Sequence, residues 1–270
     1  MRSVAGRWFP QILVGVLLPV AMYGQAPDPQ SEASRAAAAI ARVQHDDLGN
    51  GPVDALSFVN VIADARAVQG VPVLEQFFGR THDPEIKAGV ASALVRLGDK
   101  DDSYWAYLVT LASPSLDNDV PDSTSALSAR KESDISPELK AWASAHSLTV
   151  EAAVKLLVFD LPSHLVPLAR TGDPRGIPLL RRALASPNTL VATIGAAGLA
   201  QAQDADSIPL IIAACKRPPP FWGASFADSL LFFDDPRAQR TFVDYYPDVN
   251  VAEAKKFRGY RPWGGFSTQN

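Results

Sequence analysis

Residues 168–184 read LARTGDPRGIPLLRRAL, and part of this segment returns further along the chain. The run Ile-Pro-Leu-Leu at 177–180 returns as Ile-Pro-Leu-Ile at 208–211. Apolar residues between these runs recur at spacings of three and four, which is the period of an α-helix. The repeating unit is therefore predicted to be two helices of unequal length.

An earlier copy of this unit lies nearer the start of the chain. The segment 91–99 is similar to 196–204, and Val-Pro-Val-Leu at 71–74 is similar to 177–180. Two short amphipathic helices cannot bury their apolar faces alone, so neighbouring pairs are expected to stack. Almost no segment alternates apolar and polar residues as strands do. We expect an all-α fold, an α-solenoid of stacked antiparallel helix pairs with a period of about 31.

The repeated segment resembles the short HEAT-like repeat of phycobilisome-lyase-type HEAT proteins and of many exported bacterial proteins. The residues that carry the resemblance are 168–184 together with the alanine- and glycine-rich helix that ends at Asp204. The resemblance is good over 167–215, fair over 71–112 and degenerate over 220–246. It implies an α-solenoid with a protein-interaction role, and it carries no catalytic residues.

The repeat and the composition divide the chain into five parts. Residues 113–136 are rich in Ser, Asp, Pro, Thr and Asn, which is typical of a linker or long surface loop, and they interrupt the array. We expect the following order: 1–26, a signal peptide; 31–112, an N-terminal helical segment with one degenerate repeat; 113–136, the linker or loop; 137–247, the repeat array; and 248–270, an aromatic C-terminal cap or tail.

The first residues have the pattern of a secretory signal peptide. Arg2 and Arg7 precede an apolar run, 12–22, which small and polar residues follow. A spanning helix needs roughly 20 apolar residues, and this run is shorter and contains Pro19. The pattern predicts an exported bacterial protein, periplasmic or extracellular, with no stable membrane span in the mature chain; an uncleaved anchor is the alternative.

Charge and cysteine content exclude several classes of protein. The chain has 25 basic and 29 acidic residues, so no strong positive field attracts nucleic acid. Its one cysteine, Cys215, can form neither an internal disulfide nor a thiolate zinc site. Because Cys215 is in helical phase with Ile208 and Ile211, we expect it to be a small buried apolar group rather than a nucleophile.

Acidic residues at regular positions are interpreted as helix caps rather than as metal ligands. Asp173, Asp204 and Asp235 are separated by one repeat each, too far apart in a helix stack for one ion to bind adjacent members. An Asp or Ser before Pro is a helix start signal. It occurs five times, at Asp83-Pro84, Ser136-Pro137, Asp173-Pro174, Ser186-Pro187 and Asp235-Pro236.

No other residues have the spacing of a reactive site. The four histidines (His45, His82, His146 and His164) form no paired ligand motif, and the acidic run 116–122 lacks the spacing of a calcium loop. We therefore expect no catalytic residues, no metal and no cofactor.

Aromatic residues near the C-terminus are the candidates for partner binding. Trp222 belongs to an aromatic segment, 218–233, that is interpreted as an end cap of the array. Tyr260, Arg261 and Trp263 lie in the tail and are residue types enriched at interface hot spots, so the tail is either a cap or a docking peptide.

These features indicate a secreted or periplasmic, non-catalytic protein-binding or scaffold module whose partner is another protein or peptide. Two alternatives stay open. One is an enzyme or lyase-like protein that uses a solenoid pocket, and the other is a structural subunit of a cell-envelope complex.

Overall fold

A computed structural model describes residues 29–49, 51–117, 119–124, 126, 129, 131–217 and 221–252. In this part of the chain every regular element is a helix and no strand is present, which confirms the all-α prediction. The α-helices are α1 (Pro29–Gln44), α2 (Pro52–Asp64), α3 (Val71–Arg80), α4 (Pro84–Arg96), α5 (Asp102–Ala112), α7 (Pro137–Ala145), α8 (Val150–Lys155), α9 (Leu161–Arg170), α10 (Ile177–Leu184), α11 (Thr189–Gln201), α12 (Ile208–Ala214), α13 (Phe221–Leu230) and α14 (Pro236–Tyr245).

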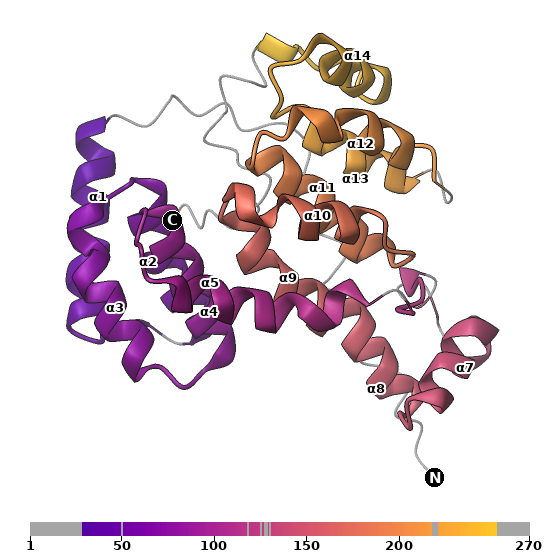
Figure 1. The fold of residues 1–270 in the computed structure, drawn as a ribbon, viewed down its shortest axis with the longest axis horizontal. Helices are drawn as coiled ribbons and strands as arrows, with labels where there is room; N and C mark the ends of the chain where they lie inside the picture. Colours follow the sequence, from indigo (N-terminus) through magenta and orange to yellow (C-terminus); the bar gives the residue numbers. More distant parts are fainter. Residues whose placement is uncertain are drawn as a thin grey trace.

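Most of these helices pack in two rows (Figure 1). In the first row α2 contacts α4, α4 contacts α9, α9 contacts α11 and α11 contacts α13. In the second row α1 contacts α3, α10 contacts α12 and α12 contacts α14. Contacts between the rows join the pairs α1–α2, α3–α4, α5–α9, α10–α11 and α12–α13.

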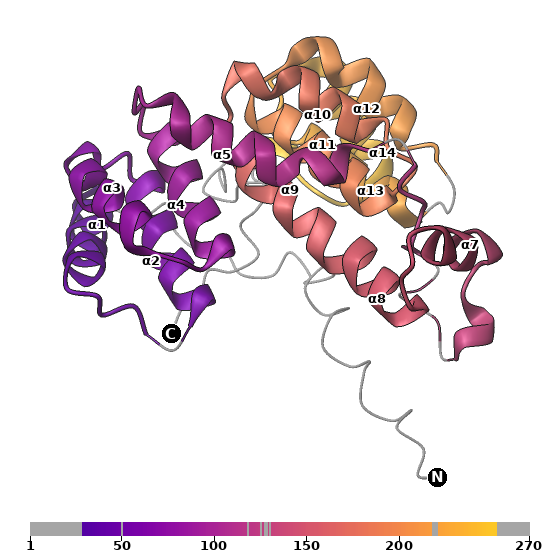
Figure 2. The same cartoon turned by 60° about the horizontal axis from the view of Figure 1, so that its bottom comes forward.

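The pair α5–α9 is formed by helices that are distant in sequence. Residues 113–160 lie between them and include α7 and α8, which project from the two rows (Figure 2). Because α9 contacts α4 as well as α5 and α11, the packing continues past this insertion. The interruption of the repeat in sequence is therefore an insertion within one helix pair.

The segment 113–136, which its composition assigned to a linker or long surface loop, is partly packed against the fold. Ser113–Leu116 forms a 3₁₀ turn, and the Ser115 hydroxyl donates a 2.6 Å hydrogen bond to the carbonyl oxygen of Leu161. Val120, Ser123 and Ala126 are also buried. These contacts fix the described part of the segment to α9 and its surroundings.

Helices α8 and α9 are continuous through a π-helical turn, Leu156–Asp160. The resulting 21-residue helix, Val150–Arg170, is the one helix among the described residues that is long and apolar enough to cross a membrane. Its Leu157, Leu165 and Leu168 are fully buried within the fold. A core helix of a folded domain has the same length and composition, so this helix is weak support for a membrane span.

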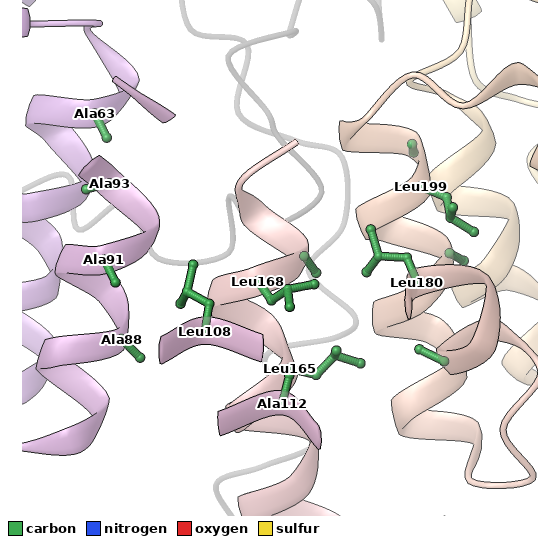
Figure 3. Packing of buried hydrophobic residues seen from close by; sticks show 14 of the residues in the cluster. Ala63, Ala88, Ala91, Ala93, Leu108, Ala112, Leu165, Leu168, Leu180 and Leu199 are labelled. Carbon is green, nitrogen blue, oxygen red and sulfur yellow. The ribbon is translucent and has the colours of Figure 1, made fainter. Parts of the chain in front are cut away.

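Apolar contacts extend along the rows as one band. Its buried residues run from Ala36 on α1 to Phe242 on α14. Figure 3 shows the central part, where Leu108 of α5 lies between the alanines of α4 and Leu168 of α9. A second, smaller cluster lies around α7, α8 and Val120.

Two glycines bring helices of the band close together. A Cβ atom on Gly195 of α11 would lie 2.5 Å from the Leu184 nitrogen and 2.8 Å from the Leu180 oxygen of α10. A Cβ atom on Gly198 would lie 2.9 Å from Cβ of Ala169 on α9. Both positions therefore need glycine for close packing.

Four of the five predicted start signals cap a helical element. The side chains of Asp83, Ser136, Asp173 and Asp235 each accept a hydrogen bond from a backbone N–H of the turn that follows. The prediction for Ser186-Pro187 is wrong. Helix α11 begins at Thr189, and its cap is Asn188, which accepts from the N–H groups of Leu190 and Val191.

Candidate functional site

Two of the three repeated aspartates act as predicted. Asp173 and Asp235 accept from the backbone N–H of Arg175 and Arg237 over 2.9 and 2.8 Å, and each also pairs with that arginine's guanidinium. Hydrogen bonds from Arg237 lower the pKa of Asp235 to about 2. The Asp-Pro-Arg sequence is thus a self-contained cap and ion pair.

The prediction for Asp204 is wrong, because its carboxylate makes no cap hydrogen bond. It accepts instead from the guanidinium of Arg181, at 2.7 Å from Nη2, and from the hydroxyl of Ser207. The residue two positions after Asp204 is Asp206, so no local arginine is available. Arg181 on α10 replaces it and ties one helix pair to the next.

The structure brings together an aromatic cluster that the sequence did not indicate. It consists of Phe78 on α3, Tyr104 and Tyr107 on α5, and Lys87 on α4. The Phe78 ring meets Tyr104 and Tyr107 edge to face, with centroids 4.9 and 5.7 Å away. Lys87 Nζ lies 4.6 Å from the Phe78 centroid and 5.9 Å from that of Tyr107, within cation–π range.

Part of the aromatic cluster faces solvent. Tyr104 is buried, whereas Phe78, Lys87 and Tyr107 are half-buried. Burial and the charge of Asp83 raise the pKa of Tyr107, so its hydroxyl is neutral at physiological pH. The Tyr107 hydroxyl donates to the Pro84 carbonyl oxygen over 3.3 Å. Tyrosine is among the residue types that are enriched at protein-binding hot spots. The four residues come from three helices, so no local pattern identifies them.

Arg175 forms a second mixed cluster at the neighbouring pair. Its guanidinium pairs with Asp173 and, over 2.9 Å, with Asp102 at the start of α5. It also lies 4.7 Å from the ring centroid of Trp105. The guanidinium is already paired with two carboxylates and lies over an aromatic ring, so this cluster is interpreted as structural.

The residues predicted to bind a partner are not brought into a described site. Trp222 lies on α13, but its side chain is outside the part of the chain whose side chains the structure describes. Tyr260, Arg261 and Trp263 lie outside the described residues, as do residues 1–26. The roles assigned to these residues stay predictions.

The remaining reactive residues have structural surroundings. Cys215 is buried, and burial raises the pKa of its thiol to about 11, as expected for an unreactive apolar group. His146 stacks on Trp142 with ring centroids 4.1 Å apart, and its Nε2 lies 3.3 Å from Asp119. Among the described residues no three His, Cys, Asp or Glu side chains form a group able to hold a metal ion.

Comparisons with known protein families, curated proteins and solved structures found no match to this chain.

Proposed function

We propose that this protein is an α-solenoid of HEAT-like repeats that serves as a non-catalytic protein-binding or scaffold module. The observation that carries the proposal is the agreement between sequence period and helix boundaries. The 3₁₀ turns Pro174–Gly176 and Ala205–Ser207 are separated by one period of the sequence repeat, and α10 and α12 follow them directly. The earlier turn Val68–Gly70 precedes α3 in the same way.

Helix α14 has the character of an end cap. On α14, Ala238 and Phe242 are buried against the preceding helices, whereas Arg237 and Arg240 are exposed. Repeat arrays require such a polar outer face at their ends, because no further repeat covers the last pair.

The aromatic cluster is the surface that we assign to partner binding. Tyr107 and Phe78 offer large apolar area that is already ordered by edge-to-face contacts, which lowers the entropy cost of binding. The adjacent Lys87 has no ion pair within the described structure, so its charge is free to meet an acidic group of a partner.

We also propose that the protein is exported, on the basis of the basic start and apolar run before residue 27. Cell fractionation and the intact mass of the recovered protein test this. Recovery of the full-length chain from the cytoplasm would contradict export.

The binding function is tested by crosslinking and affinity recovery from the native cell envelope with three forms of the protein. These are the wild type, Tyr107→Ala, and the control Phe159→Ala, whose ring is 42% exposed on the π-helical turn outside the cluster. We expect a specific protein to be recovered by the wild type and the control, and at least about tenfold less by Tyr107→Ala. Equal recovery by all three forms, or no specific protein, would contradict the proposal.

A further inference from the structure

Carboxylates lie beside the rings of the aromatic cluster. On α3, Glu75 is exposed and precedes Phe78 by three residues, so the two side chains share one face of the helix. On α5, Asp101 is the capping residue and precedes Tyr104 by three residues. Burial, and after it the charges of Asp99, Glu75 and Asp101, raise the pKa of Tyr104. These carboxylates therefore lie within electrostatic range of the cluster.

A further carboxylate lies beside Tyr107. Asp83 caps α4, and the next residue, Pro84, accepts the hydrogen bond from the Tyr107 hydroxyl. The carboxylates around the cluster are called the acidic rim here: Glu75, Asp83, Asp99 and Asp101. None of them forms an ion pair with another described residue. Their charges are therefore available to an additional group.

The cations near the acidic rim do not balance it. Lys87 lies over the rings of the cluster, and Lys100 lies in the loop between α4 and α5. Arg80 at the end of α3 is already paired with Asp46. Four carboxylates and two lysines leave the surface negatively charged. It favours a segment with both basic and aromatic side chains, because cations pair with carboxylates and pack on ring faces.

The C-terminal tail has this composition. Residues 253–270 read EAKKFRGYRPWGGFSTQN, with four basic residues and one acidic residue. The basic residues alternate with aromatic ones in the order Lys255, Lys256, Phe257, Arg258, Tyr260, Arg261 and Trp263. The one acidic residue, Glu253, has the charge that Lys87 requires. The tail therefore complements the surface in charge and in side-chain type.

The tail is long enough to reach the cluster. It follows Ala252, which comes after α14. Helix α13, which packs on α14, is three helix contacts from α4 along the first row, through α11 and α9 (Figure 1). At roughly 8–10 Å for each contact, the separation is about 24–30 Å. The segment from Ala252 to Trp263 spans about 36–40 Å when extended.

We propose that the tail, residues 253–270, docks on the acidic rim and the aromatic cluster of its own chain. Its lysines and arginines pair with the rim, and its aromatic rings add apolar contact with Phe78 and Tyr107. Exposed ion pairs are individually weak, but a tethered segment is present at an effective concentration on the order of mM, so several weak contacts are sufficient. The inference rests on the proposed function in one respect, because it uses the same surface.

The test is zero-length crosslinking of the full chain with a water-soluble carbodiimide, which joins a lysine amine to a carboxylate in direct contact. Monomer is separated from dimer before digestion, and the crosslinks of Lys255 and Lys256 are quantified by mass spectrometry. Glu151 is the reference carboxylate, because it is exposed on α8 outside the cluster. Tyr107→Ala is compared with the control Phe159→Ala.

We expect the monomer to contain crosslinks from Lys255 or Lys256 to the acidic rim, at least about tenfold more abundant than crosslinks to Glu151. Tyr107→Ala should lower their yield at least about threefold, whereas Phe159→Ala should not. About 1 M sodium chloride should lower the yield in the wild type, because it screens exposed charges beyond roughly 3 Å.

No crosslinks to the acidic rim, equal crosslinking to Glu151, or rim crosslinks confined to the dimer would overturn the proposal. Equal yields from Tyr107→Ala and Phe159→Ala would also overturn it. If Tyr107→Ala fails to fold, as judged by circular dichroism, the salt dependence of the wild type decides, and an unchanged yield in salt counts against docking. Failure to recover a partner from the cell envelope would contradict the proposed function alone, since these crosslinks form within one chain.

Discussion

Asn188 at the start of α11 donates a 3.2 Å hydrogen bond from Nδ2 to the carbonyl oxygen of Leu157 in the π-helical turn between α8 and α9. In that turn the N–H of Leu161 bonds the carbonyl of Leu156, so the next donor in the same pattern would come from residue 162. Residue 162 is proline and has no N–H. Asn188 therefore supplies the hydrogen bond that the helix cannot make for itself, while its Oδ1 caps α11.

The first prediction is that Asn188→Ala destabilises the protein. It removes a helix cap and leaves a buried carbonyl with a weaker partner, so the free energy of unfolding should fall by about 2–4 kcal/mol. Urea unfolding followed by circular dichroism measures this. The control Ser34→Ala removes an exposed hydroxyl on α1 and should change stability by less than about 0.5 kcal/mol. A similar loss in both variants would refute the role of Asn188.

Two glycine substitutions should change the free energy of unfolding in opposite directions. In Gly195→Ala the new methyl group meets the backbone of α10, so we expect a loss of about 2 kcal/mol or more. Gly79 on α3 has no atom within 4 Å of the corresponding position. Gly79→Ala should therefore stabilise its helix by about 0.5–1 kcal/mol. Thermal unfolding of both variants tests the close approach of α10 and α11, and a neutral Gly195→Ala would show that the helices can separate.

The third prediction concerns acid stability. The folded-state pKa of Asp235 is about 2, below its usual value of 3.8, so the ionised form stabilises the fold above pH 4 and this contribution is lost as the pH falls toward 2. Asp235→Asn keeps a side chain that can cap α14 but removes the titrating charge. Its unfolding free energy should fall less steeply than that of the wild type between pH 4 and 2. Parallel pH profiles would contradict this.

The fourth prediction is that Cys215 reacts slowly in the folded protein. Its thiol is buried and its pKa is about 11, so very little thiolate forms at pH 8. A colorimetric thiol reagent should label the native protein far more slowly than the protein unfolded in guanidinium chloride. Equal rates in both states would show that the α12–α13 region opens readily.

The features that the sequence predicts correctly are those with a local signal. The caps Asp83, Ser136, Asp173 and Asp235 each act on a backbone N–H two or three residues away, so spacing alone identifies them. The sequence period likewise fixes where α10 and α12 begin, because each repeat unit uses the same turn.

The predicted caps at Ser186 and Asp204 are wrong because residues distant in sequence decide which groups bond there. Ser186-Pro187 has the local form of a helix start, but Asn188 contacts Ser123 and Leu157, and these contacts place the cap two residues later. Asp204 is paired by Arg181, which belongs to the preceding helix pair. The aromatic cluster also joins residues from three separate helices, so no single stretch of sequence contains it.

The insertion between α5 and α9 affects how the chain unfolds. Helix α5 contacts α4, which precedes it, and α9, which lies beyond residues 113–160, and α9 contacts helices on both sides of that point. The entropy of closing a loop grows only with the logarithm of its length, so a long detour costs little more than a short one. Neither flank can complete its packing until α9 is in place. The residues before and after the insertion should therefore melt together, in one transition, although a long stretch of chain separates them.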